Sequence, residues 1–153
     1  MNESSFSKEQ VHEVLVEAIE DKLKLIEDSI DQLKLSAAED TKSSAGDKYE
    51  TGREMVRQEI DKAEQMRLEY RKQLDQLANI KPKELLSRVQ SGSLIITDKV
   101  PLYVSVSFGK VTINEQDIFV ISAQAPLARI LMGKQAGDQV QFNGVKYLIS
   151  AVQ

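Results

Sequence analysis

Two long stretches of the chain, residues 1–45 and 53–81, contain neither Gly nor Pro, the residues that most often interrupt regular structure. Within the first stretch an apolar seam of near-heptad spacing runs through Ile19, Leu23, Ile26, Ile30, Leu33 and Ala37. A similar seam in the second half of this region runs through Val56, Ile60, Ala63, Met66, Tyr70, Leu74 and Leu77. This spacing predicts two long helices, each with one apolar stripe. Because neither helix can bury its stripe alone, we expect them to pair as an antiparallel coiled-coil hairpin.

The ends of this hairpin carry recognisable signals. Ser7 and Gln10 form a capping-box pattern that predicts the start of the first helix. The residues between the helices are polar and favour a turn, and four acidic residues surround it: Glu39, Asp40, Asp47 and Glu50. Carboxylates at such a tip are suitable Mg²⁺ ligands if another molecule completes the coordination. The alternative is that they are solvated residues at helix ends, Asp47 in particular.

The second half of the chain has a different composition. Residues 78–153 contain 8 basic and 5 acidic residues, whereas residues 1–77 contain 12 and 19. Short β-branched or aromatic runs after residue 93 predict five or six antiparallel strands. Asn143-Gly144 predicts a tight hairpin turn, and Pro126 and Gly133 predict the ends of one short helix. We therefore predict an α+β chain with a helical hairpin over 1–77, a linker over 78–83 and a small β domain over 84–153.

Several classes of function are excluded or disfavoured by composition. The chain has no Cys and one His, so thiol catalysis and Cys-based metal sites are impossible. His12 has no Glu-x-x-His partner, and we expect it to lie on the surface or at the edge of the seam without a role. The N-terminus lacks the features of a signal peptide, and no run of 18 apolar residues exists. We therefore expect a cytoplasmic protein with no membrane association and no cofactor of its own.

A motif in the second half resembles a known family. Eleven residues fit the pattern Ile-Ser-x-x-Ser-Pro-(Ile/Leu)-x-x-x-Leu-(Ile/Leu/Met)-Gly-Lys-x-x-Gly-Asp-x-Val: Ile121, Ser122, Pro126, Leu127, Leu131, Met132, Gly133, Lys134, Gly137, Asp138 and Val140. Ala125 stands where the pattern has its second Ser. Around the hairpin turn Asp40, Lys42, Tyr49, Arg53 and Glu54 also align if two residues are inserted. In these motifs, and in the order of its modules, the chain resembles the bacterial GreA/GreB transcription elongation factors.

The resemblance implies a mechanism that needs a partner enzyme. A small β domain of FKBP-like fold would dock on RNA polymerase, and we select Leu127, Arg129 and Lys134 as its contact residues. The hairpin would enter the secondary channel and bring Glu39, Asp40, Asp47 and Glu50 to the polymerase active site. There Asp40 and Asp47 would share a Mg²⁺ ion with the polymerase, which then cleaves its own backtracked transcript. Such a factor is not itself an enzyme, would be a monomer, and would meet nucleic acid only through the elongation complex.

One departure from the family pattern keeps a second function open. The family has another acid three residues after the tip Asp, whereas Ser43 follows Asp40 at that distance. The chain could therefore be a secondary-channel regulator of the DksA or Rnk type that does not stimulate cleavage. Two functions of other classes are a prolyl isomerase, which needs more aromatic residues than this β domain can spare from its core, and a coiled-coil adaptor, whose helices would pair between chains.

Overall fold

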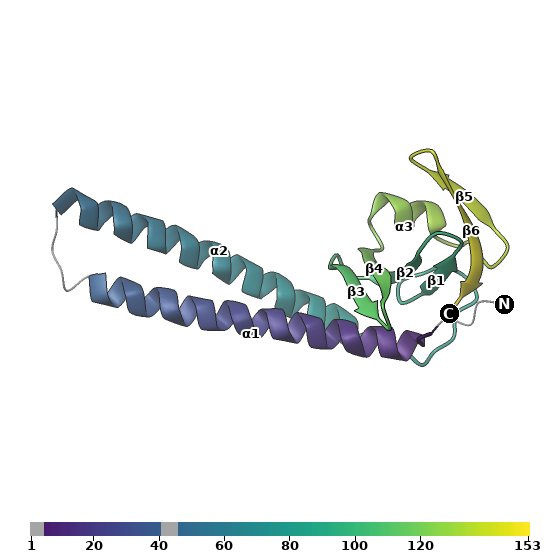
Figure 1. The fold of residues 1–153 in the computed structure, drawn as a ribbon, viewed down its shortest axis with the longest axis horizontal. Helices are drawn as coiled ribbons and strands as arrows, with labels where there is room; N and C mark the ends of the chain where they lie inside the picture. The colour runs from purple at the N-terminus through teal and green to yellow at the C-terminus, as the bar shows by residue number, and fades with distance from the viewer. Residues whose placement is uncertain (1–4, 41–45) are drawn as a thin grey trace. The chain divides into compact units, whose positions relative to one another are not determined.

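The computed structural model of this protein describes residues 5–40 and 46–153, and the side chains of residues 5–39 and 51–153. Two long helices are followed by four strands, a short helix and two more strands (Figure 1). Their bounds are α1 Lys8–Asp40, α2 Gly46–Ala78, β1 Leu94–Thr97, β2 Pro101–Ser105, β3 Gly109–Ile113, β4 Gln116–Ser122, α3 Pro126–Leu131, β5 Gln139–Phe142 and β6 Val145–Val152. The predicted α+β class, a helical hairpin followed by a small β domain with one short helix, is confirmed.

Residue contacts divide the chain into two compact units. One unit contains residues 1–18 and 75–153, and the other contains residues 19–74. The first therefore holds the start of α1, the end of α2 and every described strand. The second holds the distal part of the hairpin. The segment 78–83 marks the end of helical structure, since α2 ends at Ala78.

The start of α1 is fixed by its own side chains. The backbone N–H of Gln10 donates to Ser7 Oγ at 3.1 Å, and the N–H of Ser7 donates to Gln10 Oε1 at 2.9 Å. These reciprocal bonds satisfy two amide donors, Gln10 N–H at the start of the helix and Ser7 N–H at the cap, that would otherwise lack partners. The predicted capping box is confirmed.

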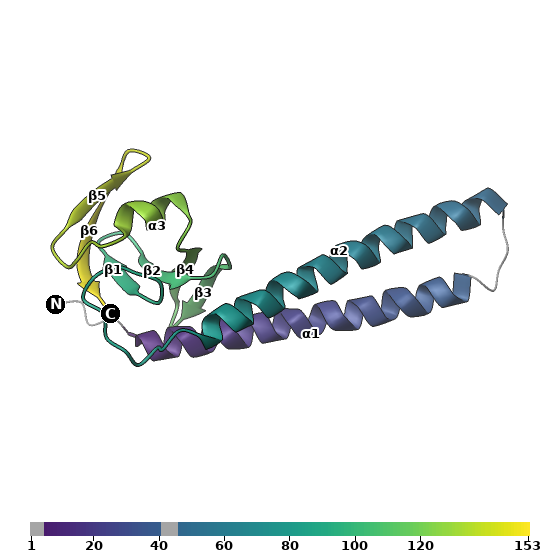
Figure 2. The ribbon, with the colours of Figure 1, turned by 180° about the vertical axis from the view of Figure 1, so that it is seen from behind.

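In the second unit α1 and α2 run antiparallel (Figure 2). Two ion pairs join them. Arg71 lies 3.1 Å from Glu27, and Lys34 lies 3.7 Å from Glu64. The hairpin therefore pairs within one chain, as the short turn predicts. The Arg71 pair connects α2 to α1.

The seam of α2 differs from the prediction at one position. Met66 is 40% exposed, so its assignment to the seam is wrong. The spacing that continues from the buried Ala63 passes through Arg67, which is half-buried. The Nε atom of Arg67 is buried and has no hydrogen-bond partner among the described residues. A charged side chain therefore occupies a position where the heptad favours an apolar one.

The six strands form one sheet in the order β3-β4-β2-β1-β6-β5. Four of the neighbouring pairs are antiparallel, but β2 and β4 are parallel, with Leu102 beside Phe119 and Ser105 beside Ser122. The predicted all-antiparallel arrangement is wrong for this pair. After β2 the chain forms β3 two strand positions away in the sheet. The next strand, β4, then fills the position between β3 and β2 and runs parallel to β2. Hydrophobic alternation along single strands does not encode this choice of neighbour.

The sheet is covered by helices on both faces. On one face Leu102 and Val104 of β2 share a buried core with Ala128 and Leu131 of α3. Tyr103 lies between them and points to the opposite face, because successive strand residues alternate. Its hydroxyl meets His12 of α1. The first turns of α1 are therefore part of the core of the β domain.

Candidate functional site

The predicted tip residues gather at one end of the hairpin. Glu39 is exposed near the C-terminal end of α1, and Asp40 is the last residue of that helix. Asp47 and Glu50 lie at the start of α2. The side chains of Asp40, Asp47 and Glu50 lie outside the described residues, so their role as Mg²⁺ ligands stays a prediction.

Helix electrostatics separates these four acids into two pairs. Asp47 and Glu50 lie at a helix N-terminus, where the positive end of the dipole stabilises a carboxylate. Glu39 and Asp40 lie at a helix C-terminus, where a negative charge is unfavourable by about 0.3–1 kcal/mol. The last turn of α1 contains no basic residue to offset them. Stability of the helices therefore accounts for Asp47 and Glu50 but not for Glu39 and Asp40.

The three residues predicted to contact a partner differ in how exposed they are. Leu127 is half-buried and packs against the core beneath α3, so much of its role is structural. Arg129 and Lys134 are exposed, and neither side chain forms a hydrogen bond or ion pair with a residue that the structure describes. These two cations are therefore available to a partner.

Other residues of the motif have local structural functions. The backbone of Gly133 and Lys134 pairs with Val89, through Gly133 N–H to Val89 O at 2.9 Å and Val89 N–H to Lys134 O at 2.8 Å. Asp138 accepts a bond from Gln135 N–H at 2.9 Å and closes the next loop. Ala125, which replaces the usual Ser, leaves α3 without a side-chain cap. The motif thus builds α3, which carries Arg129, and the loop after it, which carries Lys134.

His12 makes a contact with Tyr103 that the sequence did not predict. It is half-buried, and its Nδ1 lies 2.6 Å from the hydroxyl of Tyr103. Its expected place on the surface or at the seam edge is therefore wrong. Burial lowers the pKa of His12, with Lys8 acting in the same direction and Glu13 opposing. Burial also raises the pKa of Tyr103. No pattern in the sequence links these residues, because 91 positions separate them.

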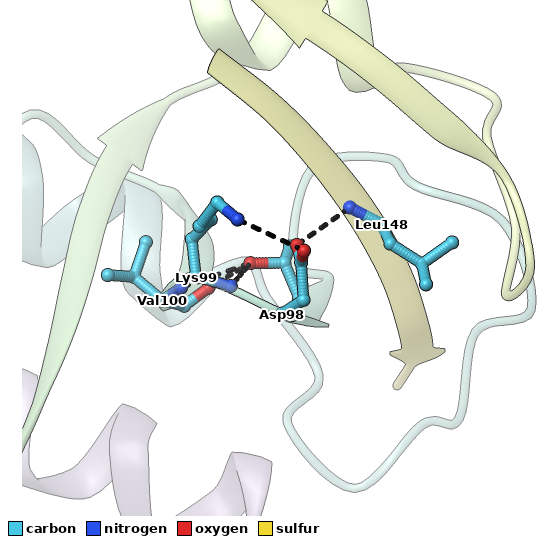
Figure 3. Close-up of polar contacts among 5 residues, drawn as sticks. Asp98, Lys99, Val100 and Leu148 are labelled. Carbon is cyan, nitrogen blue, oxygen red and sulfur yellow. Dashed lines mark hydrogen bonds and ion pairs between the residues drawn. The ribbon is translucent and has the colours of Figure 1, made fainter.

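A second missed cluster surrounds Asp98, after β1 (Figure 3). Asp98 Oδ1 accepts a hydrogen bond from Leu148 N–H at 2.8 Å, and its Oδ2 lies 3.2 Å from Lys99 Nζ. The bond from Leu148, followed by those from Lys99, lowers the pKa of Asp98. The cluster lies where the pairing of β1 with β6 shifts register, between Ile96 and Thr97. Its role is to hold an irregular strand pair, and it contains no arrangement for catalysis.

The described part of the chain lacks two further features. Among those residues, no group of three or more His, Cys, Asp or Glu side chains is arranged to hold a metal ion. Within the same residues, no helix combines the length and apolar content that crossing a membrane requires.

Comparison with known proteins finds structural likeness only. No family model and no curated protein matches the sequence. The chain is similar to the solved structure of the transcription factor Gfh1, with 16% identity, a TM-score of 0.39, and coverage of 90% of this chain and 92% of that one. It is also similar to the GreA factor homolog 1 (Gfh1) protein of Thermus thermophilus, with 14% identity, a TM-score of 0.35, and coverage of 90% and 94%. Likeness at this level carries no functional argument.

Proposed function

We propose that this chain is an accessory transcription factor that binds RNA polymerase and inserts its helical hairpin into the secondary channel. The observation that carries the proposal is that α1 ends with Glu39 and Asp40, at the helix terminus where the dipole disfavours a negative charge. Two acids at this helix end have a reason to be there if they act in the active site of the polymerase, which the tip of the hairpin would reach. At 1.5 Å per residue, the 33 residues of α1 extend about 50 Å.

In this proposal the tip supplies carboxylates and the polymerase supplies the reaction. Tip carboxylates in the channel would help to hold a second Mg²⁺ and to orient the attacking water. Two metal ions would then stabilise the attacking and the leaving oxygen of phosphodiester hydrolysis. The factor itself is no enzyme and needs no buried catalytic group. Arg129 and Lys134 of the β domain serve as docking cations for an acidic surface on the polymerase.

A second candidate function is regulation without cleavage. Ser43 stands where the family pattern has an acid, so the tip has one carboxylate fewer at that spacing. Such a factor would occupy the channel and alter polymerase activity while adding no complete set of metal ligands.

The test uses stalled, backtracked elongation complexes of the cognate polymerase with the full chain. We expect shortened transcripts with the wild type and none with Asp40→Asn, while Glu59→Gln, an exposed acid midway along α2, acts as the matched control. Binding without shortening would select the regulator. Absence of binding would overturn both functions.

Docking is tested separately by affinity for the polymerase. We expect the double variant Arg129→Ala/Lys134→Ala to bind at least tenfold more weakly than the wild type. Lys146→Ala, an exposed cation on β6, should bind normally. Equal affinities of all three proteins would contradict the assignment of the docking cations.

A further inference from the structure

The β-domain unit contains a cavity, lined by both polar and apolar groups, that the proposed function does not use. It has a volume of about 510 Å³ and lies between the last turn of α2, residues 79–92 and the ends of β2 and β4. This volume falls within the range of about 300–1,000 Å³ that is usual for small-molecule sites. All of its lining residues belong to the unit formed by residues 1–18 and 75–153.

Two exposed carboxamides contribute to the lining. Gln76 lies in the last turn of α2 and Gln90 lies in the segment before β1. Neither side chain forms a hydrogen bond with another residue that the structure describes. A carboxamide presents a donor and an acceptor side by side, which complements the edge of a nucleobase.

The rest of the lining limits the ligand further. Ile80 and Leu86 provide apolar surface, and Lys81 and Glu84 contribute opposite charges. The lining therefore has no excess of positive charge that would favour a phosphate group. Apolar contact suits the face of a flat ring better than the hydroxyl groups of a sugar.

A buried hydroxyl in the wall also lacks a partner. Ser105, at the end of β2, lines the cavity, and its Oγ is buried without a hydrogen bond to any described residue. Buried polar atoms normally have a protein, water or ligand partner.

We propose that this cavity binds a small neutral heterocycle with an amide-type edge, of the nucleobase or nucleoside class. Gln76 and Gln90 read the edge of the ring, while Ile80 and Leu86 contact its face. The site is separate from the tip and from the docking cations, so its test does not depend on polymerase binding.

The experiment is an NMR titration of the ¹⁵N-labelled full chain with adenosine, guanosine, cytidine and uridine. We expect at least one nucleoside to give saturable shifts of the Gly92 and Gln124 amides, which line the cavity. Gln76→Leu and Gln90→Leu should each weaken that binding at least fivefold. The matched control Gln141→Leu, on β5 outside the cavity, should bind as the wild type does.

Three results would overturn the proposal. The first is the absence of saturable shifts with all four nucleosides at 5 mM. The second is binding that both cavity variants retain while their spectra remain folded. The third is binding of ribose equal to that of the nucleosides. Each of these would show that the ring edge is not what the protein recognises.

Discussion

Replacement of Tyr103 by Phe tests whether α1 is an integral part of the β-domain core. The Tyr103 side chain is fully buried, and its ring meets that of His12 edge-on, with centroids 6.0 Å apart. Burial lowers the pKa of His12, so at neutral pH the imidazole is uncharged and its Nδ1 can accept a hydrogen bond from the Tyr103 hydroxyl. Tyr103→Phe removes this bond and leaves the ring in place.

The expected loss of stability can be worked out from the interactions in this contact. One buried hydrogen bond contributes about 1 kcal/mol net, and a half-buried imidazole nitrogen left without a partner adds to the loss. We therefore expect Tyr103→Phe to lower the free energy of unfolding of this unit by about 1–2 kcal/mol. For a chain of this length that corresponds to a fall of roughly 2–8 °C in melting temperature.

The contact also predicts a dependence of stability on pH. Because the pKa of His12 is lowered on folding, the unfolded chain binds a proton that the folded chain does not. Stability is therefore complete above the unfolded pKa of about 6.5 and declines as the pH falls from there through the folded pKa. His12→Ala should remove this component of the pH dependence.

The assay is urea unfolding followed through the amide resonances of β1 and β2, for wild type, Tyr103→Phe, His12→Ala and the double variant. At pH 7.5 the two substitutions should be non-additive, with a coupling energy of about 1 kcal/mol. Additivity within about 0.3 kcal/mol would refute the proposed bond. Equal stability of the wild type at pH 7.5 and pH 5.5 would refute the reasoning about His12.

Three other substitutions test separate features. Arg67→Leu should stabilise the distal hairpin by about 1 kcal/mol, because the buried Nε has no partner among the residues that the structure describes. Amide exchange in this unit should then slow, and faster exchange would contradict the prediction. Glu115→Gly should raise the melting temperature, because Glu115 has φ +66° and a left-handed residue other than Gly costs roughly 1–2 kcal/mol. A lower melting temperature would contradict the idea that Glu115 is strained. Asp98→Ala should lower stability at neutral pH, whereas Asp98→Asn, which keeps an acceptor for Leu148 N–H, should lose less. Because the pKa of Asp98 is lowered, the deficit of the Ala variant should shrink as the pH falls below about 4 in acid unfolding.

Features that depend on neighbouring residues could be predicted from the sequence. The capping box of Ser7 and Gln10 forms as expected, since both partners lie within one helical turn. Asn143 and Gly144 adopt positive φ values of 49° and 77° and join β5 to β6, as this dipeptide favours. The two long helices could be predicted from the spacing of their apolar residues, and α3 from the residues at its two ends.

Features that depend on distant contacts could not be predicted. Met66 and Arg67 are adjacent, and only the packing of α2 against α1 decides which of them faces the seam. The parallel pairing of β2 with β4 depends on where β3 lies, which no single strand encodes. The cavity beside Ser105 exists only because three separate segments meet there.

The sequence by itself determined the modules, their order and the acids at the hairpin tip, because these depend on local spacing and on side-chain chemistry. The tertiary structure decided which distant residues of the chain contact one another. It placed His12 against Tyr103, made the first turns of α1 part of the β-domain core, and left Arg129 and Lys134 exposed, with no partner among the described residues. The physical reason is that burial and long-range hydrogen bonds depend on the position of the whole chain, whereas helix and turn formation depends on residues a few positions apart.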